Sequence, residues 1–301
     1  MGAIIVHGGA GRVPASEMGR RQEILNQAAE VGLKTLGDKG PLTAVERAIN
    51  LLEDSDLFNA GRGGAMRLNG EVSLDASLMT SDLRCGAVAA MRGICHAISI
   101  ARLVMEETPY TLLVGRAATE LALQYSYQQE DLRTERNIRR WLAARETVAN
   151  LSYKEQLQLL RQLVTARDEQ LKSERHGTVC AVAWIDYGHL AAGTSTGGVA
   201  SPVMHEGRVG DTPVIGSGTY CNAYGGASAT GVGEAIIRVT LTREVVRLIE
   251  SGLHPQEAAE RAMEQFEART KSEAGVIALD RQGRHGAAFN TETMQTAFAH
   301  E

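Results

Sequence analysis

The sequence has few cysteines, and none stand in the paired spacing that metal-binding or disulfide-rich proteins use. The four cysteines lie at positions 85, 95, 180 and 221 of 301 residues. They fall in apolar segments, which favours reduced, partly buried thiols over a disulfide framework or a zinc site. Basic runs are also missing, since acidic residues interrupt them and the formal net charge is −5. We therefore expect a small-molecule partner and neither a nucleic acid nor a membrane.

Long hydrophobic runs are absent as well. The apolar start, residues 3–6, is too short for a secretory signal or a membrane span and is followed by His7 and glycines. We therefore expect the protein to stay in the cytoplasm.

Glycine and proline are missing between Gly115 and Gly177, where Arg, Glu, Gln and Lys are interleaved with leucines. This composition predicts helices in the segment of about 128–177 rather than a flexible linker. A partner-binding helix is one interpretation of its charges, and solvated charge on a linker is the favoured one.

The apolar content is 44%, enough for one large domain over residues 1–301. Periodicity predicts helices over 18–36, from about 43 after a capping box of Thr43 and Glu46, and over 97–107, 111–125, 234–250 and 255–268. It predicts strands over 2–6, 71–78, 85–90, 179–185, 189–194, 213–216, 275–279 and 285–289. Runs of neighbouring strands punctuated by paired helices favour an α+β fold over a doubly wound parallel sheet.

Thr178 is the strongest candidate for a catalytic residue. A long polar segment stops just before it, and a hydrophobic strand follows. If the Gly177-Thr178 bond is cut, the new α-amine of Thr178 can act as the base for its own hydroxyl, because such amines titrate near pH 8. Gly177 suits the scissile position because it tolerates strained backbone conformations. From this tripeptide alone, an ordinary strand entry is the simpler interpretation.

Several short motifs occur together in a specific order. After HGTV at 176–179 come TSTGG at 194–198, GRVGDTP at 207–213 and ATGVGE at 229–234; upstream are HGGAG at 7–11, LFNAG at 57–61 and LDAS at 74–77. In this order and spacing the sequence resembles the plant-type asparaginase and isoaspartyl peptidase family of N-terminal-nucleophile hydrolases. The resemblance covers most of the chain outside about 128–175. One departure is Cys95-His96, where the family usually has Asn-Pro.

The resemblance implies a fold and a maturation step. The fold is a four-layer αββα sandwich of two mostly antiparallel sheets. Autocleavage between Gly177 and Thr178 would give an α subunit of residues 1–177, ending in a variable linker, and a β subunit of residues 178–301. Two cleaved units would pair as a homodimer.

The resemblance also implies roles around the nucleophile. Thr196 would bond to Thr178 and assist its activation, and Asn59 would organise the site, although a turn asparagine is the simpler interpretation from composition. The hydroxyl of Thr230 and the N–H of Gly231 would form an oxyanion hole. The glycine-rich stretch around them lacks the lysine of a phosphate-binding loop.

Substrate recognition is expected from Arg208 and Asp211. An arginine can bind an α-carboxylate in a bidentate manner, and an aspartate can accept from an α-ammonium, although a surface ion pair is the simpler alternative. The backbones of Gly231 and Gly233 are expected to contact the substrate. L-asparagine and β-aspartyl dipeptides share this head group, so the implied activity is hydrolysis of the side-chain amide of L-aspartyl units.

No cofactor is expected for catalysis, but the resemblance implies a structural sodium ion. Its ligands would be the main-chain carbonyls of Leu52, Glu53, Ser55, Phe58, Ala60 and Arg62. The acidic side chains of 53–56 are expected to be solvated.

Three alternatives remain open. A glycosylasparaginase-like amidase would typically carry an aspartate where this chain has Gly177. A threonine-aspartase protease of the same fold is disfavoured, because the GRVGDTP motif favours recognition of a free amino acid head group. The third alternative is an uncleaved relative that binds an amino acid without catalysis.

Overall fold

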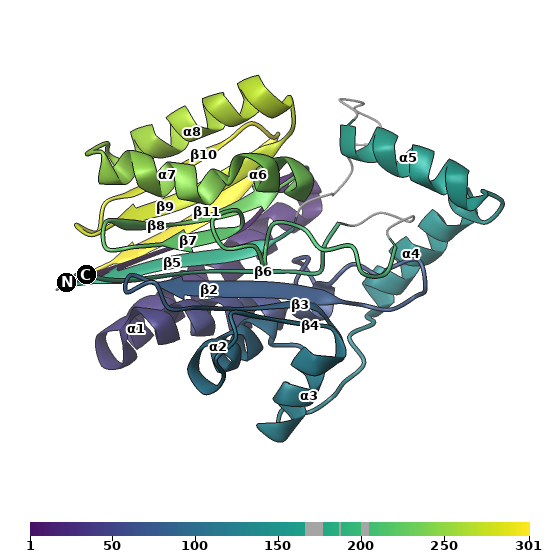
Figure 1. Ribbon diagram of the computed structural model, residues 1–301, viewed down its shortest axis with the longest axis horizontal. Coiled ribbons are helices and arrows are strands. Elements are labelled where there is room, and N and C mark those ends of the chain that lie inside the picture. Colours follow the sequence, from purple (N-terminus) through teal and green to yellow (C-terminus); the bar gives the residue numbers. More distant parts are fainter. Residues whose placement is uncertain (166–176, 187, 200–204) are drawn as a thin grey trace.

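Two sheets lie face to face in the centre of the molecule, and helices cover both outer faces (Figure 1). The computed structural model describes residues 1–165, 177–186, 188–199 and 205–301. This arrangement confirms the α+β class and the four layers in the order helix, sheet, sheet, helix. No helix within these ranges is both long enough and apolar enough to cross a lipid bilayer.

The larger sheet contains β5, the strand that follows Thr178, in an interior position. Its order is β11-β1-β5-β6-β2-β3-β4, and neighbouring strands are antiparallel except β3 and β4. The bounds are β1 Gly2–Gly11, β2 Leu74–Thr80, β3 Cys85–Met91, β4 Leu112–Val114, β5 Val179–Ile185, β6 His189–Thr196 and β11 Thr293–His300. Helices α1 (Ala15–Glu53) and α2 (Ala97–Glu107) cover its outer face.

The smaller sheet packs on the inner face of the larger one. Its order is β10-β9-β8-β7. The bounds are β7 Thr219–Cys221, β8 Gly225–Gly231, β9 Ala274–Asp280 and β10 His285–Phe289. Its outer face is covered by α7 (Leu241–Glu250) and α8 (Pro255–Thr270), with the short α6 (Gly233–Val239) at the end of β8. Val182 and Ala192 of one sheet meet Ile277 and Leu279 of the other in a shared core.

Helix boundaries differ from the prediction at two backbone irregularities. The two helices expected before residue 54 are confirmed as two segments of α1, separated by the non-helical backbone of Gly40 (φ 77°, ψ 174°) just before Pro41. Thr43 lies inside the second segment and does not cap it. The helix expected over 234–250 is instead divided into α6 and α7 at Thr240, which has φ 49°. The bounds of α2 are as predicted.

Four further predictions were wrong, and each concerns a strand or a segment next to one. Residues 213–216 form turns with a single bridge from Ile215 to Thr219. The helix expected from 111 begins only at α3 (Arg116–Gln124), because β4 pairs first with β3. The expected turn at 8–11 is part of β1, which continues past a register shift along β11. Strand β8 escaped prediction because it consists of Gly, Ala, Ser and Thr, which carry little apolar signal.

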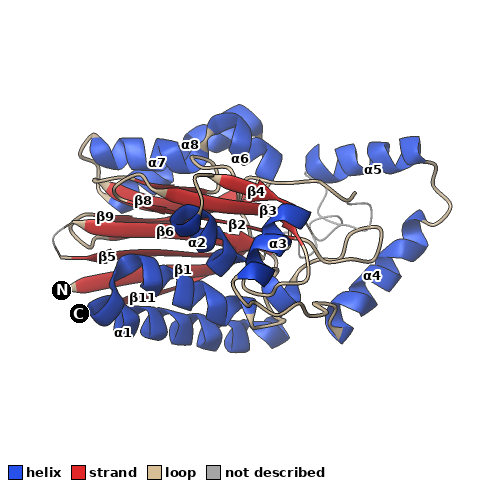
Figure 2. Cartoon of the chain, turned by 60° about the horizontal axis from the view of Figure 1, so that its bottom comes forward, coloured by secondary structure: helices blue, strands red, loops and turns tan. Residues whose placement is uncertain are grey.

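The segment before Thr178 is helical where the structure describes it. Helices α4 (Glu135–Val148) and α5 (Tyr153–Thr165) extend to one side of the sandwich (Figure 2). Trp141 anchors α4, since its Nε1 donates to the Arg67 carbonyl at 2.9 Å. The helix prediction for about 128–177 is confirmed over these two elements, and residues 166–176 lie outside the described ranges.

Candidate active site

Thr178 lies at the start of β5, beside the last residue of the neighbouring strand. The register of β5 and β6 places Val179 opposite Ser195, so Thr178 and Thr196 meet at the same end of the sheet. The Thr178 Oγ1 donates to the Thr196 Oγ1 at 3.1 Å, and both residues are buried. The structure thus brings the predicted nucleophile and its predicted helper into direct contact.

Gly177 is held against Asn59. The Asn59 N–H donates to the Gly177 carbonyl at 3.0 Å, which is the carbonyl of the predicted scissile bond. A Cβ at position 177 would lie 2.8 Å from both the Asn59 N and Cβ atoms. The backbone of Gly177 is not in the left-handed region. Glycine is therefore required here by close approach to Asn59 and not by backbone strain, which corrects the reason given from sequence.

Asn59 connects the surroundings of Thr178 to the loop that follows α1. Its carbonyl accepts from Gly197 N–H at 2.8 Å, and its Oδ1 accepts from Ala65 N–H at 2.8 Å. Its Nδ2 donates to the Gly198 carbonyl. Both ends of the side chain and both backbone groups thus have partners around the site, so Asn59 is more than a turn residue.

Thr230 and Gly231 end β8 in the facing sheet. Cys180 Sγ contacts the Ala229 carbonyl at 3.6 Å, so the end of β8 lies over the start of β5 near Thr178. The Thr230 hydroxyl is buried and has no hydrogen-bond partner among the described residues. Such a hydroxyl is free to donate to a substrate oxygen.

The stretch around Gly231 is not the loop that the sequence predicted. Thr230 and Gly231 are strand residues paired with β9, and only Val232 separates them from α6. Gly231 has φ 147°, and a Cβ there would lie 2.5 Å from the Glu273 carbonyl. Glycine is therefore needed where the strand turns into the helix.

Arg208 and Asp211 converge on Gly233. A Cβ at Gly233 would lie 2.8 Å from the Asp211 Oδ1 and 3.0 Å from the Arg208 Nη2. Asp211 is buried, and burial raises its pKa to about 7, while the nearby Arg208 charge opposes the shift. Its Oδ2 has no hydrogen-bond partner among the described residues. The surface ion pair considered from sequence is wrong for Asp211, because its carboxylate is buried.

Glu234 is a site residue that the sequence reasoning missed. The Arg208 Nε and Nη2 donate to its two carboxylate oxygens at 2.8 and 2.7 Å. This bidentate pair fixes the plane of the guanidinium, and Nη1 has no hydrogen bond to any described residue. Glu234 is the last residue of the ATGVGE motif, and its position directly after the glycines was the sequence signal that could have identified it as a site residue.

Asp75 is a second missed residue. It pairs with Thr196 across β2 and β6, and its side chain is fully buried. Burial raises its pKa, and the charges of Arg67 and Arg208 oppose that shift. An aspartate in the middle of the otherwise small and apolar LDAS strand was the signal, because buried acids in strands need a nearby positive charge.

The six carbonyl groups expected to hold a cation lie between Leu52 and Arg62, and three of them, those of Leu52, Glu53 and Ala60, accept hydrogen bonds. A Cβ at Gly61 would lie 2.2 Å from the Glu53 carbonyl oxygen, and one at Gly63 would lie 1.8 Å from the Phe58 carbonyl oxygen. Among the described residues, no hydrogen bond reaches the carbonyl oxygens of Ser55, Phe58 or Arg62. The Glu53 side chain is buried and accepts from Ser195 and Ile98, so the expectation that this carboxylate is solvated was wrong.

A sequence model of a protein family described as asparaginase matches residues 1–301. The chain belongs to this asparaginase family. Among its relatives, a plant-type L-asparaginase of Pyrococcus abyssi is 40% identical over 304 residues, covering 100% of this chain and 97% of the relative. An isoaspartyl peptidase/L-asparaginase of Xenopus laevis is 37% identical over 300 residues, covering 98% of this chain and 91% of the relative. The resemblance drawn from the motifs is confirmed.

Proposed function

We propose that this asparaginase family member is an isoaspartyl peptidase and L-asparaginase that uses Thr178 as its nucleophile. The observation that carries the proposal is the contact between the Thr178 and Thr196 hydroxyls at the buried end of β5. Relatives named plant-type L-asparaginase and isoaspartyl peptidase/L-asparaginase match along nearly their whole length, which supports an amidohydrolase with these substrates.

Maturation comes first. The Thr178 hydroxyl attacks the Gly177 carbonyl, the acyl group moves from nitrogen to oxygen, and water hydrolyses the resulting ester. The products are residues 1–177 and residues 178–301, and the second begins with a free α-amine. The Asn59 N–H supports this step, because the donor already on the Gly177 carbonyl would stabilise negative charge as it develops there.

Turnover follows the same chemistry with an external amide. The Thr178 amine takes the proton of its hydroxyl, and the oxygen attacks the side-chain carbonyl of an L-aspartyl unit. The Thr230 hydroxyl and the Gly231 N–H stabilise the oxyanion. The leaving amine takes a proton and departs, as ammonia from L-asparagine or as an amino acid from a β-aspartyl dipeptide, and water then releases L-aspartate.

Arg208 and Asp211, which lie beside Gly233, recognise the substrate in this proposal. The free Nη1 edge of Arg208 binds the α-carboxylate, and Asp211 accepts from the α-ammonium. A carboxylate with a raised pKa ionises when a cation comes within hydrogen-bond distance, because the positive charge favours its charged form. Gly233 leaves room for both contacts.

The loop after α1 is proposed to hold a structural sodium ion on the carbonyls of Leu52, Glu53, Ser55, Phe58, Ala60 and Arg62. The ion would fix the loop that carries Asn59. It takes no part in the chemistry, which needs no cofactor.

Mass spectrometry with N-terminal sequencing tests the nucleophile. We expect two fragments, the second beginning at Thr178, and ammonia release from L-asparagine. Thr178→Ala is expected to stay one inactive chain, and the matched Thr178→Ser, which keeps a hydroxyl, to be cleaved. An intact wild type that still hydrolyses asparagine contradicts the mechanism. An intact and inactive one favours the uncleaved amino-acid-binding relative, and cleavage of glycosylated asparagine alone favours the glycosylasparaginase-like alternative.

Homodimer formation and a cytoplasmic location are proposed alongside. The four cysteines are unpaired, which supports a reducing compartment.

Strand β4 lies at the edge of the larger sheet, and exposed apolar side chains gather on it and on α3. They are Leu112, Val114, Leu123 and Tyr125. In sedimentation, Val114→Asp is expected to shift a dimer toward monomer, whereas Leu142→Asp, at an exposed position on α4, leaves it unchanged.

A further inference from the structure

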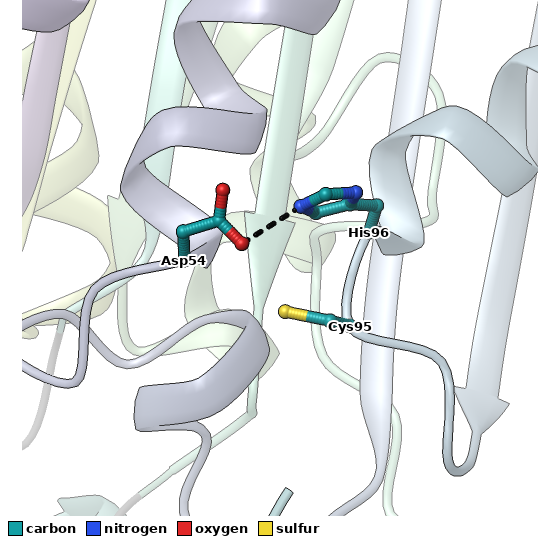
Figure 3. Close-up of side chains that lie close together, drawn as sticks. All are labelled: Asp54, Cys95 and His96. Atoms are coloured by element: carbon teal, nitrogen blue, oxygen red, sulfur yellow. Dashed lines mark hydrogen bonds and ion pairs between the residues drawn. The ribbon is translucent and has the colours of Figure 1, made fainter. Parts of the chain in front are cut away.

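Three side chains with different ligand atoms lie together at the junction of α1 and α2 (Figure 3). Asp54 directly follows α1, and Cys95 and His96 directly precede α2. Their ligand atoms all lie within 4.8 Å of one another, and the His96 Nε2 is 3.0 Å from the Asp54 Oδ1. The sequence hid this group because Asp54 and Cys95 are far apart along the chain.

The oxygen, nitrogen and sulfur atoms form a typical donor set for zinc. Zinc is bound at about 2.0–2.3 Å by carboxylate, imidazole and thiolate, so ligand atoms around a tetrahedral ion lie about 3–4 Å apart. Asp54 and His96 are already near that separation. Their side chains are 56% and 33% exposed, so they can rotate the remaining distance toward Cys95.

Burial raises the pKa of the Cys95 thiol to about 12, so the thiol keeps its proton when no ion is bound. A divalent ion would bind the sulfur by displacing that proton, since metal binding to cysteine releases a proton. The thiol is held in place because its Sγ donates to the Glu53 carbonyl at 3.4 Å.

Solvent reaches Asp54 and His96 from a cleft between the two helices, and Cys95 is buried behind them. The cleft has a volume of about 530 Å³, and Asp54 and His96 are among its lining residues. Glu46, Asn50 and Arg102 line the same cleft. An ion could therefore enter from solution and keep a water in a fourth coordination position, as zinc does where only three protein ligands are present.

We propose that Asp54, Cys95 and His96 form a binding site for a zinc-class divalent cation. The site adjoins the carbonyl loop proposed for sodium, since the Cys95 Sγ contacts the Glu53 carbonyl, but it differs from that loop in using side-chain ligands of a softer type. It is also independent of the proposed hydrolysis, since none of its residues takes part in that reaction. Cysteine spacing in the sequence argued against a zinc site. The proposal depends instead on the proximity of the three side chains in the folded chain.

Cobalt(II) is a suitable probe, because it occupies zinc sites and a thiolate ligand gives it a charge-transfer band in the near ultraviolet. Mature protein stripped with a chelator is titrated with Co²⁺, and then with Zn²⁺ as a competitor. We expect a thiolate band that saturates at one ion per chain and disappears when zinc is added. Zinc is also expected to raise the melting temperature, since a ligand that binds only the folded state stabilises it.

Three variants should lose the band or bind at least about tenfold more weakly: Cys95→Ser, His96→Ala and Asp54→Asn. Cys85→Ser is the matched control and should keep the band. Cys85 lies on β3, outside the proposed site, and is only partly buried. Asp54 and His96 are partly exposed, so their variants remain informative if Cys95→Ser fails to fold. The absence of a band in the wild type, or its persistence in folded Cys95→Ser, overturns the proposal.

Discussion

The buried hydroxyl of Thr230 allows a separation of catalysis from stability. It lies at the end of β8 with no hydrogen-bond partner among the described residues, and its residue is 1% exposed. A buried hydroxyl without a partner costs about 1–3 kcal/mol of desolvation. The proposed mechanism uses that hydroxyl only when an oxyanion forms. Thr230→Val, which replaces the hydroxyl with a methyl group of similar size, should therefore weaken turnover without weakening the fold.

The magnitude follows from the role of a single donor. Losing one oxyanion-hole donor costs about 3 kcal/mol of transition-state stabilisation, which is about a 100- to 1000-fold decrease in kcat. KM should change little, because the bond strengthens only in the transition state. The free energy of unfolding should stay the same or rise by about 1 kcal/mol, because no hydrogen bond is lost and a buried polar group is removed.

Thr242→Val is a matched control. The Thr242 hydroxyl, on α7, is also fully buried and has no partner among the described residues, so the chemical change is the same. We expect kcat to be unchanged there. Ammonia release is measured per mature chain, with the mature fraction determined by mass spectrometry so that slow cleavage is not mistaken for slow turnover. A fully mature Thr230→Val with kcat within about threefold of the wild type would refute the oxyanion role.

Three further predictions test the neighbouring residues. Gly177→Ala should slow maturation by about a hundredfold in a gel time course, because the new Cβ would lie 2.8 Å from Asn59 and displace its N–H donor. Arg208→Lys should raise KM for asparagine by about 10- to 100-fold with a smaller change in kcat, because lysine cannot bind Glu234 in a bidentate manner and still offer a donor to the α-carboxylate; an unchanged KM would remove Arg208 from recognition. Burial raises the pKa of Asp211 from 3.8 to about 7, so between these values the folded chain keeps a proton that the unfolded chain releases. Stability of the uncleaved Thr178→Ala chain should therefore fall as pH rises from 3.8 to about 7 and then level off, and adding Asp211→Asn should flatten that slope in urea unfolding.

Local patterns predicted the elements whose signals are local. The strand after Thr178 and the helix over 97–107 were found because apolar periodicity alone sets them. The prediction failed where tertiary contacts decide the backbone. Strand β8 has almost no apolar side chains, and it is a strand because β9 pairs along its whole length.

The candidate site divides in the same way. Motif order was sufficient to name Thr178, Thr196, Arg208 and Asp211, because each residue type carries a recognisable chemistry. The sequence did not show that Glu234 binds Arg208. An acidic residue is common at the start of a helix, and only the tertiary structure shows which arginine it contacts.

By itself, the sequence determined the family, the class of fold and the side chains that we propose attack and bind an aspartyl unit, because these are identified by residue types in a fixed order. Only the tertiary structure decided that the Gly177 carbonyl lies on the Asn59 N–H, that Asp75 stands beside Thr196, and that Asp54 meets Cys95 and His96. These proximities depend on strand register and helix packing, which bring together residues that no short-range pattern connects.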